Sequence, residues 1–196
     1  MKKVLVLYYS QSGQLKNMVD SVTGPLNVSD EVQVDYRKIK PVEKYPYPWP
    51  FYPFFDAFPE AIYMNGCDVE PLDDLADDYD LIILGYTIWF LSPSIPVTGF
   101  MQSEQAKGLF KDKPVVTLIA CRDMWVMAQE KMKNLLSDVG ATLIDNVVLT
   151  DQGGYRGFRV MWIGARALAL RAMMPDKARK QGNGGGVGQV LRVDLG

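Results

Sequence analysis

A short polar loop near the amino end of the chain carries residue types suited to hold an anion. Ser10, Gln11 and Ser12 supply hydroxyl and amide groups, and Gly13 lets the main chain approach a ligand closely. If a helix follows, its free N–H groups and positive dipole end also point at this loop. The loop therefore predicts a phosphate site, although neither common glycine-rich nucleotide motif is present. An ordinary turn that binds nothing remains the alternative.

The segments on either side of this loop predict the elements that position it. Residues 4–9 form an unbroken apolar run, which is typical of a central parallel strand covered on both faces. Leu15, Met18, Val19 and Val22 then recur at helical spacing, so one face of a helix should pack on that strand. The loop is therefore expected at the carboxyl end of a central strand.

Four further segments predict strands that alternate with helices. Residues 31–39 alternate polar and apolar residues, as a half-exposed edge strand does, whereas 79–86, 114–120 and 141–150 are largely apolar. Bulky residues follow the third strand and polar ones follow the fourth. Because the carboxyl ends of parallel strands meet at one edge of a sheet, we expect these residues beside the first loop. For Trp89 and Phe90, a place in the core is the alternative.

The composition excludes several kinds of chemistry. The chain has no histidine and two cysteines, Cys67 and Cys121, which excludes a histidine base, a Ser-His-Asp triad and the common zinc sites. The aspartates between 68 and 78 have no regular ligand spacing, so we predict no metal site. A net charge of −2, without a basic block before the tail, argues against nucleic acid as a partner.

Residues 45–59 are unusually rich in aromatic residues and prolines. Because proline interrupts helices and central strands, we predict an irregular or polyproline-like excursion. A rigid connector, a lid over an apolar substrate, a dimer contact and a lipid-facing patch all remain open for this segment. No run of about 18 uninterrupted apolar residues is present, so we predict no transmembrane span.

Two loops resemble those of a known fold. The stretch LYYSQSGQL at positions 7–15 resembles the phosphate loop of flavodoxin-like proteins, which holds the monophosphate of FMN. The segment after the third strand resembles their flavin-ring loop, with Gly85, Thr87, Trp89 and Phe90 in matching places. Residues 1 to about 173 are most similar to the FMN-dependent NAD(P)H:quinone oxidoreductase branch. The loops also resemble those of proteins known as dialkylresorcinol condensing enzymes.

The resemblance implies an α/β, flavodoxin-like three-layer sandwich, with a five-stranded parallel sheet of order 2-1-3-4-5 and helices on both faces. It implies one FMN-binding domain over 1–174, with an aromatic, proline-rich insertion at 41–66. Residues 175–196 are expected to be a flexible glycine-rich, basic tail, with a short added strand as an alternative. The residues implied to bind FMN are Ser10, Gln11, Ser12, Gly13, Gln14, Leu15, Tyr86, Thr87, Ile88, Trp89, Phe90, Cys121, Arg122 and Asp123.

The implied function is FMN-dependent transfer of hydride between NAD(P)H and a planar apolar acceptor, such as a quinone or a resorcinol-like ring. The candidates for a catalytic residue are Tyr86, Tyr155 and Arg122. A flavodoxin-type electron carrier and a cofactor-free scaffold of the same fold are the alternatives. The start of the chain resembles no secretory signal, so we expect a cytoplasmic protein. An apolar helix is predicted at 158–174, which favours a subunit contact or an acyl-lined cleft. We therefore also expect a homodimer, with peripheral membrane contact as a further option.

Overall fold

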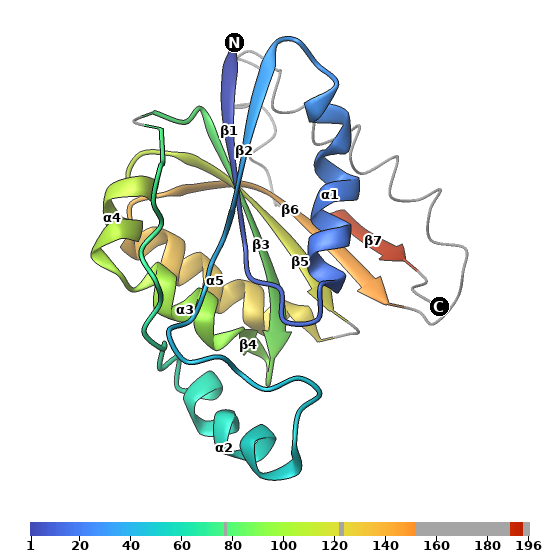
Figure 1. The fold of residues 1–196 in the computed structure, drawn as a ribbon, viewed down its shortest axis with the longest axis vertical. Coiled ribbons are helices and arrows are strands. Elements are labelled where there is room, and N and C mark those ends of the chain that lie inside the picture. The colour runs from blue at the N-terminus through green and yellow to red at the C-terminus, as the bar shows by residue number, and fades with distance from the viewer. Residues whose placement is uncertain (77, 122–123, 152–188, 194–196) are drawn as a thin grey trace.

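The computed structural model describes residues 1–76, 78–121, 124–151 and 189–193. Its strands are β1 (Lys2–Tyr8), β2 (Val32–Lys38), β3 (Leu81–Trp89), β4 (Ser92–Pro93), β5 (Pro114–Cys121), β6 (Thr142–Asp151) and β7 (Gln189–Val193). Its helices are α1 (Gln14–Asn27), α2 (Phe51–Ile62), α3 (Ile95–Met101), α4 (Glu104–Phe110) and α5 (Trp125–Asp138). Figure 1 shows these elements around one central sheet.

The sheet has the strand order β2-β1-β3-β5-β6-β7, and all neighbours along this path are parallel. The first five of these strands are the five expected from the sequence, so the predicted order 2-1-3-4-5 is confirmed. β2 lies at one edge, as its alternating pattern indicated. At the other edge β7 adds a sixth parallel strand, and the two-residue β4 pairs antiparallel with the end of β3.

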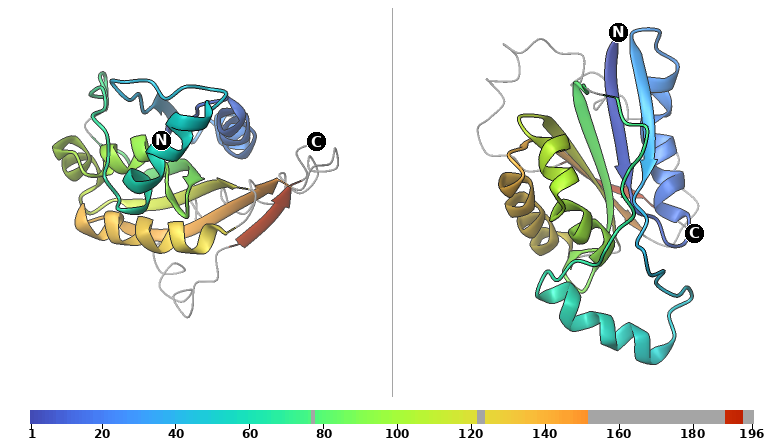
Figure 2. Two further views of the ribbon diagram at one scale, coloured as in Figure 1. Left: turned by 90° about the horizontal axis from the view of Figure 1, so that it is seen from below. Right: turned by 60° about the vertical axis from the view of Figure 1, so that its left-hand side comes forward.

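Helices cover both faces of the sheet, which makes three layers (Figure 2). Successive residues of β1 point to opposite faces. Leu5 and Leu7 join the core beneath α3, α4 and α5, whereas Val4 and Val6 join the core beneath α1. Within β1, Leu5, Val6 and Leu7 are all fully buried. The unbroken apolar run is therefore explained by a central strand that is packed on both sides.

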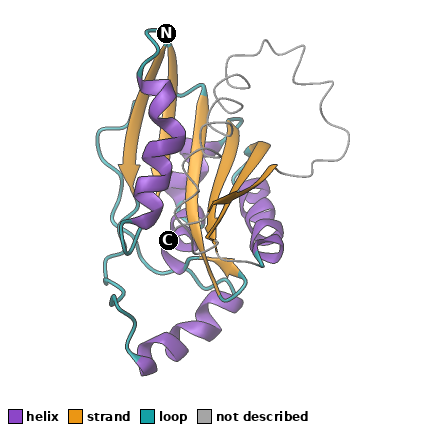
Figure 3. Ribbon diagram, turned by 90° about the vertical axis from the view of Figure 1, so that its right-hand side faces the viewer, coloured by secondary structure: helices purple, strands orange, loops and turns teal. Residues whose placement is uncertain are grey.

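The aromatic, proline-rich segment corrects one prediction. Residues 51–62 form α2 rather than an irregular excursion, and Figures 1 and 3 show this helix standing out from one end of the molecule. Pro53 lies in the first turn, where its missing N–H would have no helical partner, so only Pro59 interrupts the hydrogen-bond series. Ala57 and Ala61 are buried in one cluster with Ile95 of α3, which attaches the helix to the domain.

α2 leaves most of its aromatic side chains exposed. The large aromatic residues that are exposed in the described part of the chain all lie between positions 47 and 63: Tyr47, Phe51, Tyr52, Phe54, Phe55, Phe58 and Tyr63. Phe54 and Phe58 also contact Phe90, at ring-centroid distances of 4.8 and 4.9 Å. α2 is thus tied to the end of β3 through a few rings, while its other rings face solvent.

Candidate functional site

The polar loop predicted from the sequence lies between the carboxyl end of β1 and the start of α1. Gly13 adopts a positive φ of 89°, which permits the sharp entry into the helix. The buried Ser10 Oγ accepts hydrogen bonds from the Gly13 and Lys16 N–H groups, at 3.1 and 3.4 Å. The Ser12 Oγ accepts a long hydrogen bond from the Gln14 N–H at 3.4 Å. The loop is therefore held in a fixed conformation by its own serines.

Several main-chain donors of this loop remain available. Within the described part of the chain, the N–H groups of Gln11, Ser12 and Leu15 have no hydrogen-bond acceptor. The first turn of α1 contains no acidic residue that would neutralise the positive end of its dipole. Unused N–H groups around a glycine of positive φ at a helix start form an anion-binding arrangement.

A pocket of about 260 Å³ joins this loop to the ends of β3 and β5. Its lining residues are Ser10, Gln11, Ser12, Gln14, Leu15, Met18, Thr87, Trp89, Ala120 and Cys121. The structure thus brings together predicted residues from three separate segments. Met18 and Ala120 were not predicted, because each belongs to an apolar pattern that indicated only core packing.

Trp89 forms an aromatic wall beside this pocket. Its ring makes edge-to-face contacts with Tyr45, Trp49 and Tyr9, at centroid distances of 5.1, 5.2 and 5.9 Å. Burial raises the pKa of Tyr9 to about 12, so its hydroxyl stays protonated at neutral pH. The wall therefore presents uncharged aromatic surface.

Four predicted cofactor residues do not line this pocket. Gly13 is at the helix start and does not line the pocket. Ile88 pairs with Pro93 of β4 and packs against the core, and Phe90 packs on α2. Tyr86 is fully buried, and its hydroxyl donates a 2.6 Å hydrogen bond to Gln129 Oε1.

Tyr86 belongs to a buried polar network beneath the site. Gln129 Nε2 donates to Thr117 Oγ1 at 3.1 Å, and that hydroxyl donates to Asn146 Oδ1 at 2.9 Å. Burial raises the pKa of Tyr86 well above its ordinary value of 10.0. Because its hydroxyl is engaged in the core and does not line the pocket, the structure gives no support to Tyr86 as a proton donor.

The structure describes only part of the loop that follows β5, where the sequence predicted polar site residues. Cys121 is half-buried at the end of β5 and lines the pocket. Arg122, Asp123 and Tyr155 lie outside the described residues, as does the predicted helix at 158–174. Among the described residues no cluster of metal ligands is found, and no described helix is long and apolar enough to cross a membrane.

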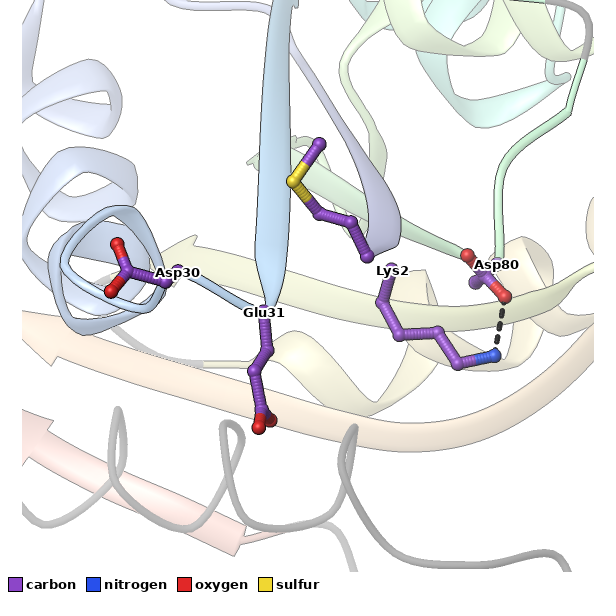
Figure 4. Close-up of a pocket in the computed structure, with 5 residues that line it drawn as sticks. Lys2, Asp30, Glu31 and Asp80 are labelled. Atoms are coloured by element: carbon purple, nitrogen blue, oxygen red, sulfur yellow. Dashed lines mark hydrogen bonds and ion pairs between the residues drawn. The ribbon is translucent and has the colours of Figure 1, made fainter.

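A wider hollow of about 560 Å³ lies at the opposite, amino ends of the strands. Figure 4 shows the ion pair of Lys2 and Asp80 there, with Asp30 and Glu31 standing apart from it at the start of β2. Three carboxylates line this hollow together with two positive groups, the Lys2 ammonium and the amino group of Met1. This surplus of negative charge is unsuited to a phosphate ligand, so the candidate site is the pocket at the carboxyl ends.

At this opposite end we expect a small, pH-dependent effect of Asp80→Asn. Hydrogen bonds from the Lys2 ammonium and the Lys3 N–H hold the pKa of Asp80 below its ordinary 3.8. The carboxylate therefore stabilises the folded state above pH 3.8, and this contribution is lost as the pH falls through the lowered pKa. Urea unfolding should show a cost below about 1 kcal/mol at pH 7 that vanishes near pH 2. An equal cost at both pH values would contradict this expectation.

Comparison with known proteins adds information on the fold. No family model and no curated protein sequence matches the chain. A flavoprotein from Lactobacillus acidophilus, solved in complex with FMN, has a TM-score of 0.60 at 20% identity, covering 76% of this chain and 93% of its own. A protein from Bacteroides eggerthii that is described as a putative flavoprotein has a TM-score of 0.62 at 16% identity, covering 86% of this chain and 99% of its own. An archaeal flavodoxin has a TM-score of 0.55 at 16% identity, covering 88% and 99%.

The fold is flavodoxin-like. TM-scores of 0.55 to 0.62 establish this architecture, whereas identities of 16 to 20% show nothing about the ligand. In open α/β sheets, ligands bind outside the carboxyl ends of the strands, where the strand order reverses. In this flavodoxin-like sheet the reversal lies between β1 and β3, and the pocket lies beside the ends of both.

Proposed function

We propose that the protein binds FMN in the pocket between the 10–13 loop, Trp89 and Cys121. We propose further that it is an oxidoreductase, which transfers hydride between NAD(P)H and a planar apolar acceptor such as a quinone or a resorcinol-like ring. The observation that carries the proposal is the continuity of one pocket from an anion-binding loop to an aromatic wall. The similarity to a flavoprotein that was solved with FMN supports it.

The residues of the 10–13 loop fit a phosphate monoester. The N–H groups of Gln11, Ser12 and Leu15 are unused within the described chain, and the hydroxyl of Ser12 lies beside them. No carboxylate lines this pocket, so nothing in its described lining repels a dianion. In this arrangement the loop amides would bind the phosphate, and the dipole of α1 would stabilise its charge.

The other end of the pocket fits a flat aromatic ring system. Thr87 offers a hydroxyl, while Trp89, Ala120 and Cys121 offer mainly apolar surface. Bound FMN would supply the hydride chemistry, which needs no histidine from the protein. The task of the chain is then to orient the flavin and to exclude water from one side of it.

The aromatic surroundings support an apolar acceptor. Tyr45 and Trp49 extend the wall away from Trp89, and Phe54 of α2 continues it at 6.0 Å from Trp49. Such a surface favours planar rings through burial and edge contacts. The highly acidic rim that helps a carrier dock its partners is not found in the described lining of the pocket, so we favour the enzyme over an electron carrier.

Ser12→Glu tests the FMN site. A carboxylate beside the loop amides should repel the phosphate and weaken FMN binding at least tenfold, or by about 1.4 kcal/mol. Quenching of flavin fluorescence on titration with the purified protein measures the affinity. Ser137→Glu, which introduces the same charge on an exposed position of α5, should bind FMN as the wild type does. Unchanged affinity in Ser12→Glu would show that any flavin site lies elsewhere.

The behaviour of the purified protein after addition of FMN distinguishes an enzyme from an electron carrier and from a scaffold. Rapid oxidation of NADH or NADPH with a quinone is the expected result. A stable one-electron reduced flavin without nicotinamide oxidation would instead identify a carrier. A colourless protein that does not respond to added FMN would identify a scaffold.

A further inference from the structure

A second cavity adjoins the proposed FMN pocket on the other side of the 10–13 loop. It has a volume of about 390 Å³, within the range of roughly 300–1,000 Å³ that is usual for small-molecule sites. Its lining residues are Tyr9, Ser10, Gln11, Lys38, Ile39, Lys40, Pro41, Lys44, Tyr45 and Glu70. Ser10 and Gln11 line both cavities, so the two meet at the loop.

The walls of this cavity are held by hydrogen bonds across the chain. Gln11 Nε2 donates to the Pro46 carbonyl at 2.8 Å, which ties the 10–13 loop to the segment after β2. The Glu70 N–H donates to the Lys40 carbonyl, also at 2.8 Å. Tyr9 and Ile39 are buried on the inner side of the cavity. The walls of the cavity are therefore fixed by hydrogen bonds of the folded chain.

The rim of this cavity carries a local surplus of positive charge. Lys38 and Lys40 lie on either side of the buried Ile39, so extended chain directs both to the same side, and Lys44 follows a few residues later. Lys40 forms a 3.7 Å ion pair with Glu70. Among the described residues, no carboxylate lies within ion-pair distance of Lys38 or Lys44.

These charges point to a dianionic ligand. Three ammonium groups around one cavity raise its potential, and within the described part of the chain only that of Lys40 has a carboxylate partner. The Ser10 Oγ already accepts two N–H groups, and its own hydrogen has no acceptor in the described chain. The cavity thus offers one ligand a hydroxyl donor, the aromatic surface of Tyr45 and two ammonium groups that no described carboxylate pairs with.

We propose that this cavity binds the phosphorylated adenosine end of NADPH, with Lys38, Lys40 and Lys44 around its 2′-phosphate. The inference rests on the proposed function, which requires a nicotinamide dinucleotide beside the neighbouring pocket. NADH carries a neutral hydroxyl in place of the 2′-phosphate and would leave two lysines uncompensated. The cavity therefore makes the protein selective for NADPH.

Titration with 2′,5′-ADP tests the cavity without any catalytic step. Full-length protein should bind 2′,5′-ADP at least tenfold more tightly than 5′-AMP, as measured by isothermal titration calorimetry. In the double variant Lys38→Gln/Lys44→Gln this difference should fall by roughly tenfold, since charge-assisted contacts to the phosphate are lost. Both lysines are exposed and form no ion pair with any residue that the structure describes, so the thermal unfolding temperature should not change.

The control is Lys111→Gln, which removes an exposed lysine between α4 and β5, away from the cavity. It should bind 2′,5′-ADP like the wild type. Equal binding of 2′,5′-ADP and 5′-AMP, or full affinity in the double variant, would overturn the proposal. So would inorganic phosphate that binds as tightly as 2′,5′-ADP, because the cavity would then be a general anion site.

Flavin fluorescence on the same samples separates this inference from the proposed function. Neither lysine lines the FMN pocket, so the double variant should bind FMN within about threefold of the wild-type affinity. Protein that binds 2′,5′-ADP but no FMN would refute the FMN proposal alone. Protein that binds FMN but does not distinguish NADPH from NADH in KM would refute the present inference alone.

Discussion

Gly99→Ala is expected to destabilise the fold by about 3 kcal/mol or more, the largest effect among the variants considered. A Cβ at this position of α3 would lie 2.0 Å from the carbonyl oxygen of Cys67 and 2.8 Å from the main-chain nitrogen of Cys67. Both contacts are with main chain, which cannot move aside as a side chain can. Gly66 faces the same spot, since a Cβ there would lie 2.3 Å from the Gly99 Cα.

The affected segment connects α2 to the domain. Gln102 holds it in place by donating to the Met64 carbonyl at 2.8 Å and accepting from the Gly66 N–H at 3.3 Å. Alanine at 99 would push residues 64–67 off α3 and loosen the attachment of α2. The close main-chain packing that this glycine permits therefore offsets its poor helix propensity.

Gly108→Ala is the matched control, because it places alanine in the other seven-residue helix of the same layer, α4. A Cβ there meets nothing within 4 Å. This variant should be neutral or more stable by up to about 1 kcal/mol, from helix propensity alone. Urea unfolding followed by circular dichroism gives both values. A cost below about 1 kcal/mol for Gly99→Ala would contradict the close packing of this segment on α3.

Gln129→Met is expected to cost about 2–4 kcal/mol. Methionine keeps the approximate size and helix propensity of glutamine but leaves the buried Tyr86 hydroxyl without its 2.6 Å acceptor and removes the donor to Thr117. A buried polar group that loses its only partner costs roughly 1–3 kcal/mol. The free energy of unfolding in urea, with an unchanged denaturant slope, measures the loss.

The double variant Gln129→Met/Tyr86→Phe shows whether the cost comes from the unpaired hydroxyl. Removing that hydroxyl as well should recover at least about 1 kcal/mol, because both partners are then apolar. Tyr86→Phe should also bind FMN with wild-type affinity, since Tyr86 does not line the pocket. Additive losses of stability in the double variant would show that the hydrogen bond contributes little. A loss of FMN affinity in Tyr86→Phe would show that Tyr86 belongs to the FMN site.

Much of the architecture followed from local patterns. The run at residues 4–9 and the alternation at 31–39 identified a central and an edge strand. The strand order, which the resemblance to flavodoxin-like proteins implied, is also confirmed. The spacing of Leu15, Met18, Val19 and Val22 identified the buried face of α1. These predictions held because burial on one or both faces imposes a period on the sequence that is visible without contacts.

α2 shows where local patterns were insufficient. Proline and aromatic content argued against a helix, but the outcome depended on where each proline fell in the turn and on whether Ala57 and Ala61 could be buried. Tyr86 shows the same for chemistry. Its place after a strand suggested a site residue, whereas the acceptor on α5 that engages it is 43 residues away.

The sequence by itself determined the α/β fold class and the polar loop that follows β1, because both depend on neighbours along the chain. The strand order was implied by the resemblance of two loops to those of flavodoxin-like proteins. Only the tertiary structure decided that this loop, Trp89 and Cys121 share one pocket, and that Lys38, Lys40 and Lys44 border a second. Both pockets are built by segments that are distant in sequence. Their chemistry depends on which charges find partners across the fold, and no local pattern records such pairing.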